Sequence, residues 1–143
     1  SMGATTVLLA AGLDLPENVK GIIADCGFTS PTEIIKKVAK QGFHINASVF
    51  LPVMNLICII TGHFGIYGVS TEKALKNSKV PILFIHGKSD NFVPFEMSER
   101  NYKEMTGEKK ILLVDGADHG MSYLVDTPSV EKHLCDFLKK ISS

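Results

Sequence analysis

Two short apolar runs, each ended by a glycine and followed by an ionisable side chain, constrain the fold of this 143-residue chain. The first run, residues 80–85, is rich in β-branched and aromatic residues, as expected of a strand buried on both faces of a parallel sheet. Gly87 ends the run and Asp90 follows in a short loop. Catalytic groups gather at the carboxyl ends of such strands, so this position favours a chemical role for Asp90.

The second run, residues 110–114, repeats this arrangement and is followed by His119. Neighbouring parallel strands end at the same edge of a sheet, so Asp90 and His119 are predicted to lie within hydrogen-bond reach. In such a pair the carboxylate orients the imidazole and stabilises its charged form while it acts as a general base. A pair of this kind still needs a nucleophile.

Ser1 is the candidate nucleophile. It is followed by Met2, Gly3 and a stretch of small residues, which is the second half of a G-x-S-x-G nucleophile elbow. Two further motifs accompany it, G-K-S-D-N-F-V-P around the acid and G-A-D-H-G around the histidine. Together the three motifs resemble the carboxyl-terminal part of an α/β-hydrolase family serine hydrolase, from the nucleophile elbow onward.

The resemblance implies a mechanism and a substrate class. Ser1 would attack an acyl carbonyl, His119 would carry its proton, and Asp90 would hold the useful tautomer. The backbone N–H of Met2 would form half of an oxyanion hole. Carboxylic esters or related acyl compounds, small and possibly lipophilic, are the expected substrates, and a serine peptidase of the same fold is the alternative.

The residues that should precede Ser1 lie outside this sequence, so we expect a fragment of a larger hydrolase. The second oxyanion donor belongs to an upstream loop, and the fragment is therefore expected to be inactive by itself. Two other interpretations stay open. Ser1 and Met2 could remain from the removal of a tag, and the chain could be a non-catalytic structural or interaction fragment.

The predicted fold class is α/β, a partial α/β-hydrolase fold with mostly parallel strands, flanking helices and a helical cap insertion. The three predicted strands are residues 19–25, 80–85 and 110–114. Within one structural domain we assign the elbow helix and first strand to residues 1–30, the cap to 31–79, and the acid and histidine to 80–143. The first strand would lack a neighbour on one side, so self-association through this edge or the cap is expected.

The cap is unusually apolar. Its large hydrophobic residues are Phe50, Leu51, Val53, Met54, Leu56, Ile57, Ile59, Ile60 and Phe64. They either form an apolar underside above the active site, which would suit a lipophilic substrate, or pack the cap helices onto each other and onto the sheet. A membrane span is disfavoured because the run is short and interrupted by proline and glycine.

Composition narrows the functional classes. The formal net charge is zero and the charges are interspersed, which offers no basic stripe for nucleic acid. Cys26, Cys58 and Cys135 show no C-x-x-C spacing and are predicted to be free thiols in a reducing, cytoplasmic location. No zinc-binding pattern is present, so we expect neither a metal nor a cofactor.

Three smaller predictions concern single residues. Asp25, at the end of the first strand, is assigned a structural role. His86 is expected to be a strand-end residue with a backbone partner. Gly107 is expected to end the helix over residues 94–105 in a left-handed conformation.

Overall fold

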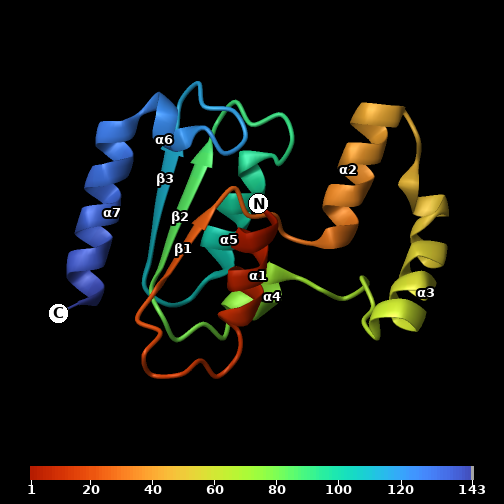
Figure 1. Ribbon diagram of the computed structural model, residues 1–143, viewed down its shortest axis with the longest axis horizontal. Coiled ribbons are helices and arrows are strands. Elements are labelled where there is room, and N and C mark those ends of the chain that lie inside the picture. Colours follow the sequence, from red (N-terminus) through yellow and green to blue (C-terminus); the bar gives the residue numbers. More distant parts are fainter. Residues whose placement is uncertain (143) are drawn as a thin grey trace.

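The computed structural model describes residues 1–142 and has a three-stranded sheet at its centre (Figure 1). All strand pairs are parallel and the order is β1-β2-β3, so the sequence prediction of a partial α/β-hydrolase sheet is confirmed. The strands are β1 (Ile22–Asp25), β2 (Ile82–Gly87) and β3 (Lys109–Val114). The helices are α1 (Met2–Ala10), α2 (Pro31–Phe43), η1 (Ala47–Val49), α3 (Leu51–Gly62), α4 (Thr71–Leu75), α5 (Phe95–Glu104), α6 (Ser122–Val125) and α7 (Thr127–Ile141).

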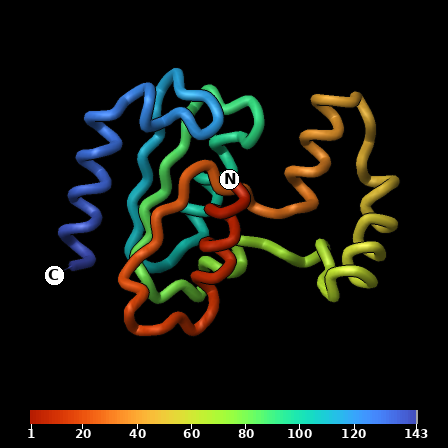
Figure 2. The backbone as a smooth tube through the Cα atoms, in the orientation of Figure 1, coloured from red at the N-terminus to blue at the C-terminus, as the bar shows by residue number. Residues whose placement is uncertain are grey.

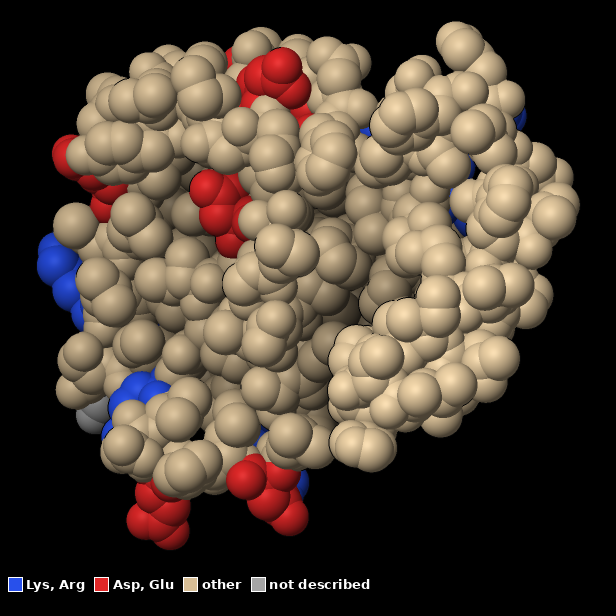
Figure 3. Space-filling view, turned by 45° about the vertical axis from the view of Figure 1, so that its right-hand side comes forward, with Lys and Arg blue, Asp and Glu red and all other residues tan. Residues whose placement is uncertain are grey.

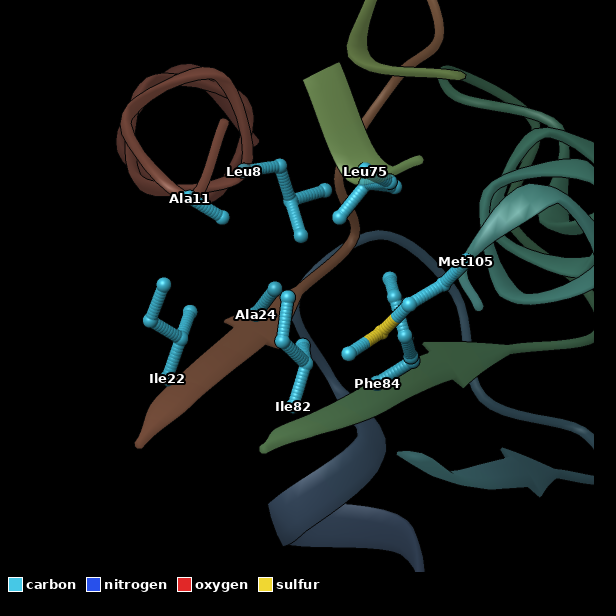
Figure 4. Close-up of a cluster of buried hydrophobic side chains, with 8 residues drawn as sticks. All are labelled: Leu8, Ala11, Ile22, Ala24, Leu75, Ile82, Phe84 and Met105. Atoms are coloured by element: carbon cyan, nitrogen blue, oxygen red, sulfur yellow. The ribbon is translucent and has the colours of Figure 1, made fainter. Parts of the chain in front are cut away.

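Strand β2 is buried along its whole length because helices cover both of its faces. Its even-numbered residues Ile82 and Phe84 join a core cluster with Leu8 of α1 and Leu75 of α4 (Figure 4). Its odd-numbered residues belong to a second cluster with Val130 and Phe137 of α7. The alternation of side chains along a strand thus divides the core into two layers.

The predicted start of the first strand was wrong, for a local reason. Strand β1 begins at Ile22 rather than residue 19, because the Val19 N–H donates to the Pro16 carbonyl in a turn at 2.9 Å. Helix α1 ends at Ala10. A Cβ on Gly12 would lie 2.8 Å from the Ala74 backbone, so the chain there passes too close for a further turn of side chains.

The predicted left-handed cap at Gly107 was also wrong. Helix α5 ends at Glu104 and Met105 is extended, while the glycines with positive φ in residues 1–142 are Gly68, Gly116 and Gly120. The Lys109 ammonium instead donates to the carbonyls of Tyr102 at 2.8 Å and Met105 at 2.6 Å. A cation at a helix C-terminus satisfies carbonyls that a glycine cap would otherwise serve.

Helices α2 and α3 form an arm, residues 31–62, that extends to one side of the sheet (Figure 2). Ser30 caps α2 by accepting the Glu33 N–H at 3.2 Å, and the helix runs on to Phe43. Of the nine apolar cap residues, Leu51 is buried and the other eight are large exposed hydrophobics. Of the two alternatives for these residues, packing as core therefore holds here only for Leu51. No helix within residues 1–142 is long and apolar enough to cross a membrane.

Candidate active site

The expected contact between the acid and the histidine is present. Nδ1 of His119 lies 2.7 Å from Oδ2 of Asp90, so this prediction is confirmed. The Asp90 side chain is fully buried, whereas 31% of the His119 side chain is exposed. Because Nδ1 faces the carboxylate, Nε2 is the ring nitrogen of His119 available to a nucleophile or substrate.

Hydrogen bonds between two loops hold this pair in place. The Ser89 N–H donates to the Ala117 carbonyl at 2.9 Å, which joins the loop after β2 to the loop after β3. The Asp118 carboxylate accepts the N–H groups of Asn91 at 3.2 Å and His119 at 2.7 Å. The acid and histidine loops are thus joined by a backbone hydrogen bond and by the Asp118 side chain.

Gly87 lets these loops approach, so Gly87→Ala is expected to destabilise the chain. A Cβ at this position would lie 2.2 Å from the Ala117 carbonyl oxygen, and backbone atoms cannot yield as a flexible side chain does. Urea unfolding should show a loss of about 1–3 kcal/mol, the range for overpacking a buried site. Gly42→Ala is the control, since nothing lies within 4 Å of its Cβ position. Equal stability of the two variants would contradict the prediction.

The Asp90 carboxylate accepts hydrogen bonds at both oxygens. Oδ1 accepts the N–H groups of Phe92 at 2.9 Å and Val93 at 2.8 Å. Oδ2 lies 2.7 Å from Nδ1 of His119 and 3.1 Å from Nε2 of His86. Burial acts to raise the pKa of Asp90, but the hydrogen bonds from His119, Val93 and Phe92 outweigh it and hold the pKa below its ordinary value.

His86 makes more contacts than the sequence predicted. It has the expected backbone partner, the Val93 carbonyl, at 2.9 Å from Nε2. It also contacts Asp90 through Nε2 and the Ser98 hydroxyl through Nδ1, the latter at 2.6 Å. The side chain is fully buried, and burial lowers its pKa below the ordinary value. The alternation of side chains along β2 could have predicted the burial of His86, since it shares a face with Phe84 beneath α5.

These two lowered pKa values predict that the folded state loses stability on acidification. Unfolded histidine takes up a proton near pH 6.5 while His86 does not, so stability falls as the pH drops below this value. Asp90 adds a second loss at lower pH, as the pH falls below the ordinary value of 3.8 and through its folded pKa. Urea midpoints measured from about pH 7 down through the folded pKa of Asp90 test the prediction. In His86→Gln the midpoint should depend less on pH around pH 6.5. A wild-type midpoint that is constant through pH 6.5 would contradict it.

Ser1 occupies the N-cap position of α1, and Met2 is the first residue of that helix. The Ser1 carbonyl accepts the N–H and the hydroxyl of Thr5, at 2.9 and 3.0 Å. Thr5 in turn accepts the Phe28 N–H at 3.0 Å, which fixes the start of α1 beside the carboxyl end of β1 (Figure 1). Within residues 1–142 the Ser1 hydroxyl makes no hydrogen bond, so none joins it to His119.

An apolar groove of about 550 Å³ begins at Ser1. It is lined by Ser1, Met2, Phe28, Pro31, Ile34, Ile35, Val38, Ala39, Phe43 and Phe92. The Phe92 ring also packs edge-on against the His119 ring, with centroids 5.1 Å apart. Figure 3 shows a hollow between the arm and the body of the molecule, bordered mainly by uncharged residues. Phe92 therefore links the groove that holds Ser1 to the histidine.

Cys26 lies beside the pair. A sulfur, a carboxylate oxygen and a ring nitrogen of Cys26, Asp90 and His119 lie within 4.8 Å of one another. A metal bound by these groups would sit about 2.0–2.3 Å from each, so the Asp90 and His119 atoms, now 2.7 Å apart, would have to separate. The Cys26 thiol donates to Asp25 at 3.1 Å and accepts the Gly120 N–H at 3.3 Å. Burial and then the Asp25 contact raise its pKa to about 12.

Comparisons with known proteins agree with this architecture. A family model described as TAP-like protein, one of the α/β-hydrolase models, matches residues 67–142, more than half of the chain. The uncharacterized protein YqkD of Bacillus subtilis is 28% identical over 142 residues, which cover 99% of this chain and 47% of YqkD. The bifunctional esterase/perhydrolase DCH of Acinetobacter calcoaceticus is 34% identical over 67 residues, 47% of this chain and 24% of DCH. The chain spans at most about half the length of these curated relatives.

Solved structures share the fold over nearly the whole chain. The esterase domain of a Rhodothermus marinus protein superposes with a TM-score of 0.66 at 21% identity, covering 97% of this chain and 57% of that one. The acylaminoacyl peptidase of Pyrococcus horikoshii gives 0.61 at 20% identity, covering 98% and 22%. Esterases and peptidases are thus both built on the architecture seen here.

Proposed function

Because this chain belongs to the α/β-hydrolase family, we propose that it supplies the catalytic groups of a serine hydrolase that cleaves carboxylic esters with an apolar acyl part. The observation that carries the proposal is the 2.7 Å contact between His119 and the buried Asp90 at the sheet edge. Its hydrogen bonds keep Asp90 ionised, so it can fix the Nδ1–H tautomer of His119 and stabilise the imidazolium.

Ser1 is the proposed nucleophile. Its Oγ attacks the ester carbonyl while Nε2 of His119 takes the hydroxyl proton, which His119 then delivers to the departing alkoxide. Water attacks the resulting acyl-serine, with His119 again accepting and returning a proton, and releases the carboxylic acid. The Met2 N–H, at the positive end of α1, is the proposed donor to the oxyanion.

The groove supports an apolar acyl group as substrate. It begins at Ser1 and continues over Ile34 and Val38 of α2, so an acyl chain bound to the serine could lie along it. Burying methylenes against such a surface contributes about 0.8 kcal/mol each. The relative DCH, described as an esterase, points to the same reaction class.

Hydrolysis of p-nitrophenyl esters of increasing acyl length tests the proposal, with an anilide of the same acyl group beside them. The ester kcat/KM should rise with acyl length and exceed that of the anilide. Ala39→Phe, which fills the groove, should lower kcat/KM for long esters and spare the acetate. Lys36→Phe is the matched control, because it places the same side chain on the exposed face of α2.

Other results would overturn the proposal. Faster cleavage of the anilide would favour a peptidase of the same fold. Absence of both hydrolysis and fluorophosphonate labelling, in this chain and in one extended before Ser1, would favour a non-catalytic structural or interaction role. An unchanged acyl-length preference in Ala39→Phe would remove the groove from the proposed site.

Two further parts of the proposal concern the setting of the protein. The three cysteines are free, which fits a reducing, cytoplasmic location. Strand β1 pairs only with β2 among the described strands, and 40% of Ile23 is exposed. Chains are therefore proposed to associate through this edge or through the apolar arm.

A further inference from the structure

His86 is a fully buried titratable group that the proposed mechanism does not use. Its Nε2 lies 2.9 Å from the Val93 carbonyl and 3.1 Å from Oδ2 of Asp90. Both of these atoms accept hydrogen bonds and neither can donate, because Asp90 is ionised. Nε2 must therefore carry a proton, which it shares between the two oxygens.

The other ring nitrogen is paired as well. The Ser98 hydroxyl lies 2.6 Å from Nδ1 of His86 and 3.4 Å from the Gly27 carbonyl. A hydroxyl has one proton, and the shorter contact receives it, so Nδ1 is an acceptor and His86 is neutral. Burial of the ring, which disfavours the charged form, agrees with this assignment.

The contacts of His86 thus include a chain that leads to the acid, while the Val93 carbonyl shares the Nε2 proton. Ser98 of α5 donates to His86, His86 donates to Oδ2 of Asp90, and the same oxygen accepts the proton on Nδ1 of His119. We propose that His86 is a positioning residue, which fixes the Asp90 carboxylate from behind so that Oδ2 faces His119. This inference rests on the proposed function, because the step that it serves is proton transfer by His119.

The charged groups around this chain of contacts do not replace the His86 donor. Asp25 at the end of β1 and Asp90 itself act on His86, and both carry negative charge. Lys37 of α2 interacts with Asp90 through space, but its ammonium donates to the carbonyls of Asn91 and Phe92, each at 2.9 Å. Among the described residues, His86 is accordingly the side-chain donor to Oδ2 besides His119.

Two substitutions separate positioning from packing. The side-chain amide of His86→Gln reaches the place of Nε2 and can still donate to Asp90. The shorter amide of His86→Asn reaches the place of Nδ1, keeps a partner for Ser98 and loses Asp90. We expect His86→Asn to lower kcat for ester hydrolysis about 10- to 100-fold with KM unchanged, the cost of a small misplacement of a catalytic group. His86→Gln should retain most of kcat.

A second measurement does not depend on activity. Nitrogen-15 NMR of the imidazole rings of this chain should show His86 as the Nε2–H tautomer near neutral pH. The Nδ1 proton of His119 should exchange with water faster in His86→Asn than in His86→Gln, because the carboxylate that protects it is less constrained. Urea midpoints of both variants show whether they are folded.

Failure of the His86 proposal can be distinguished from failure of the proposed function. A Nδ1–H tautomer or a charged ring at His86, equal losses of kcat in both variants, or no loss in either would each overturn the proposal. If the wild type neither hydrolyses esters nor reacts with a fluorophosphonate, both as this chain and as one extended before Ser1, the proposed function fails. Tautomer and exchange measurements would then still decide whether His86 positions Asp90.

Discussion

Ser1→Ala is expected to abolish covalent labelling by a fluorophosphonate probe and to reduce ester hydrolysis on the order of a millionfold, as loss of a serine nucleophile does elsewhere. Of the serines in this chain, the motif selects only Ser1, which precedes a helix of small residues whose first N–H, that of Met2, is the proposed oxyanion donor. The measurement is best made in a chain extended before Ser1, where the turn that exposes the nucleophile is complete.

Two other serines near the acid and histidine loops provide controls. Ser89 is exposed in the acid loop, and Ser122 is buried at the start of α6 with a hydroxyl that has no partner in residues 1–142. Neither Ser89→Ala nor Ser122→Ala should reduce labelling. Labelling that survives Ser1→Ala would make Ser1 a bystander or a tag remnant and place the chemistry elsewhere.

Comparing this chain with the extended chain also measures the contribution of the second oxyanion donor. If the second oxyanion donor is absent from this chain, turnover should be about 100- to 1,000-fold lower than in the extended chain, the usual effect of removing one such donor. Equal turnover of the two chains would show that residues 1–143 contain a complete oxyanion site.

Asp90→Asn is expected to lower kcat about 10,000-fold while leaving the fold in place. The amide oxygen of asparagine can still accept the N–H groups of Phe92 and Val93. Its NH₂ group would face Nδ1 of His119, which would then become an acceptor, and the proton would move to Nε2. In that tautomer His119 cannot take the proton of the nucleophile.

Asp25→Asn is the matched control for this substitution. Asp25 also ends a strand at the active edge, but its contact is with the Cys26 thiol rather than with His119. Steady-state kinetics should therefore show little change in kcat, in keeping with the structural role predicted for Asp25. A loss in Asp25→Asn as large as that in Asp90→Asn would contradict the assignment of Asp90 as the acid.

The pairing of Asp90 with His119 could be predicted from the sequence because it depends on a regularity of parallel sheets. Each residue follows a buried apolar run, and parallel strands bring their carboxyl ends to one edge. The register of the strands, with Phe84 between Ala24 and Ile111, was not predicted and comes from the structure. Burial of β2 on both faces was readable from its composition.

Contacts between elements distant in sequence could not be predicted this way. Lys109 satisfies the end of α5 in place of Gly107, and no local pattern shows where a lysine on a later strand will reach. The arm is a second case. Apolar residues at helical spacing predict a packed face, yet α3 packs mainly against η1 and leaves most of its large side chains exposed.

The sequence by itself therefore indicated three strands of a parallel sheet and the acid–histidine pair, because buried apolar runs that each lead into an ionisable residue mark one edge of such a sheet. Only the tertiary structure decided which side chains contact the acid and the histidine loop from other elements. Ser98 reaches His86 because α5 packs over β2, and Cys26 reaches the Gly120 N–H because β1 ends beside the histidine loop. Such contacts depend on how helices and loops pack on the sheet, which side-chain periodicity along a single element does not specify.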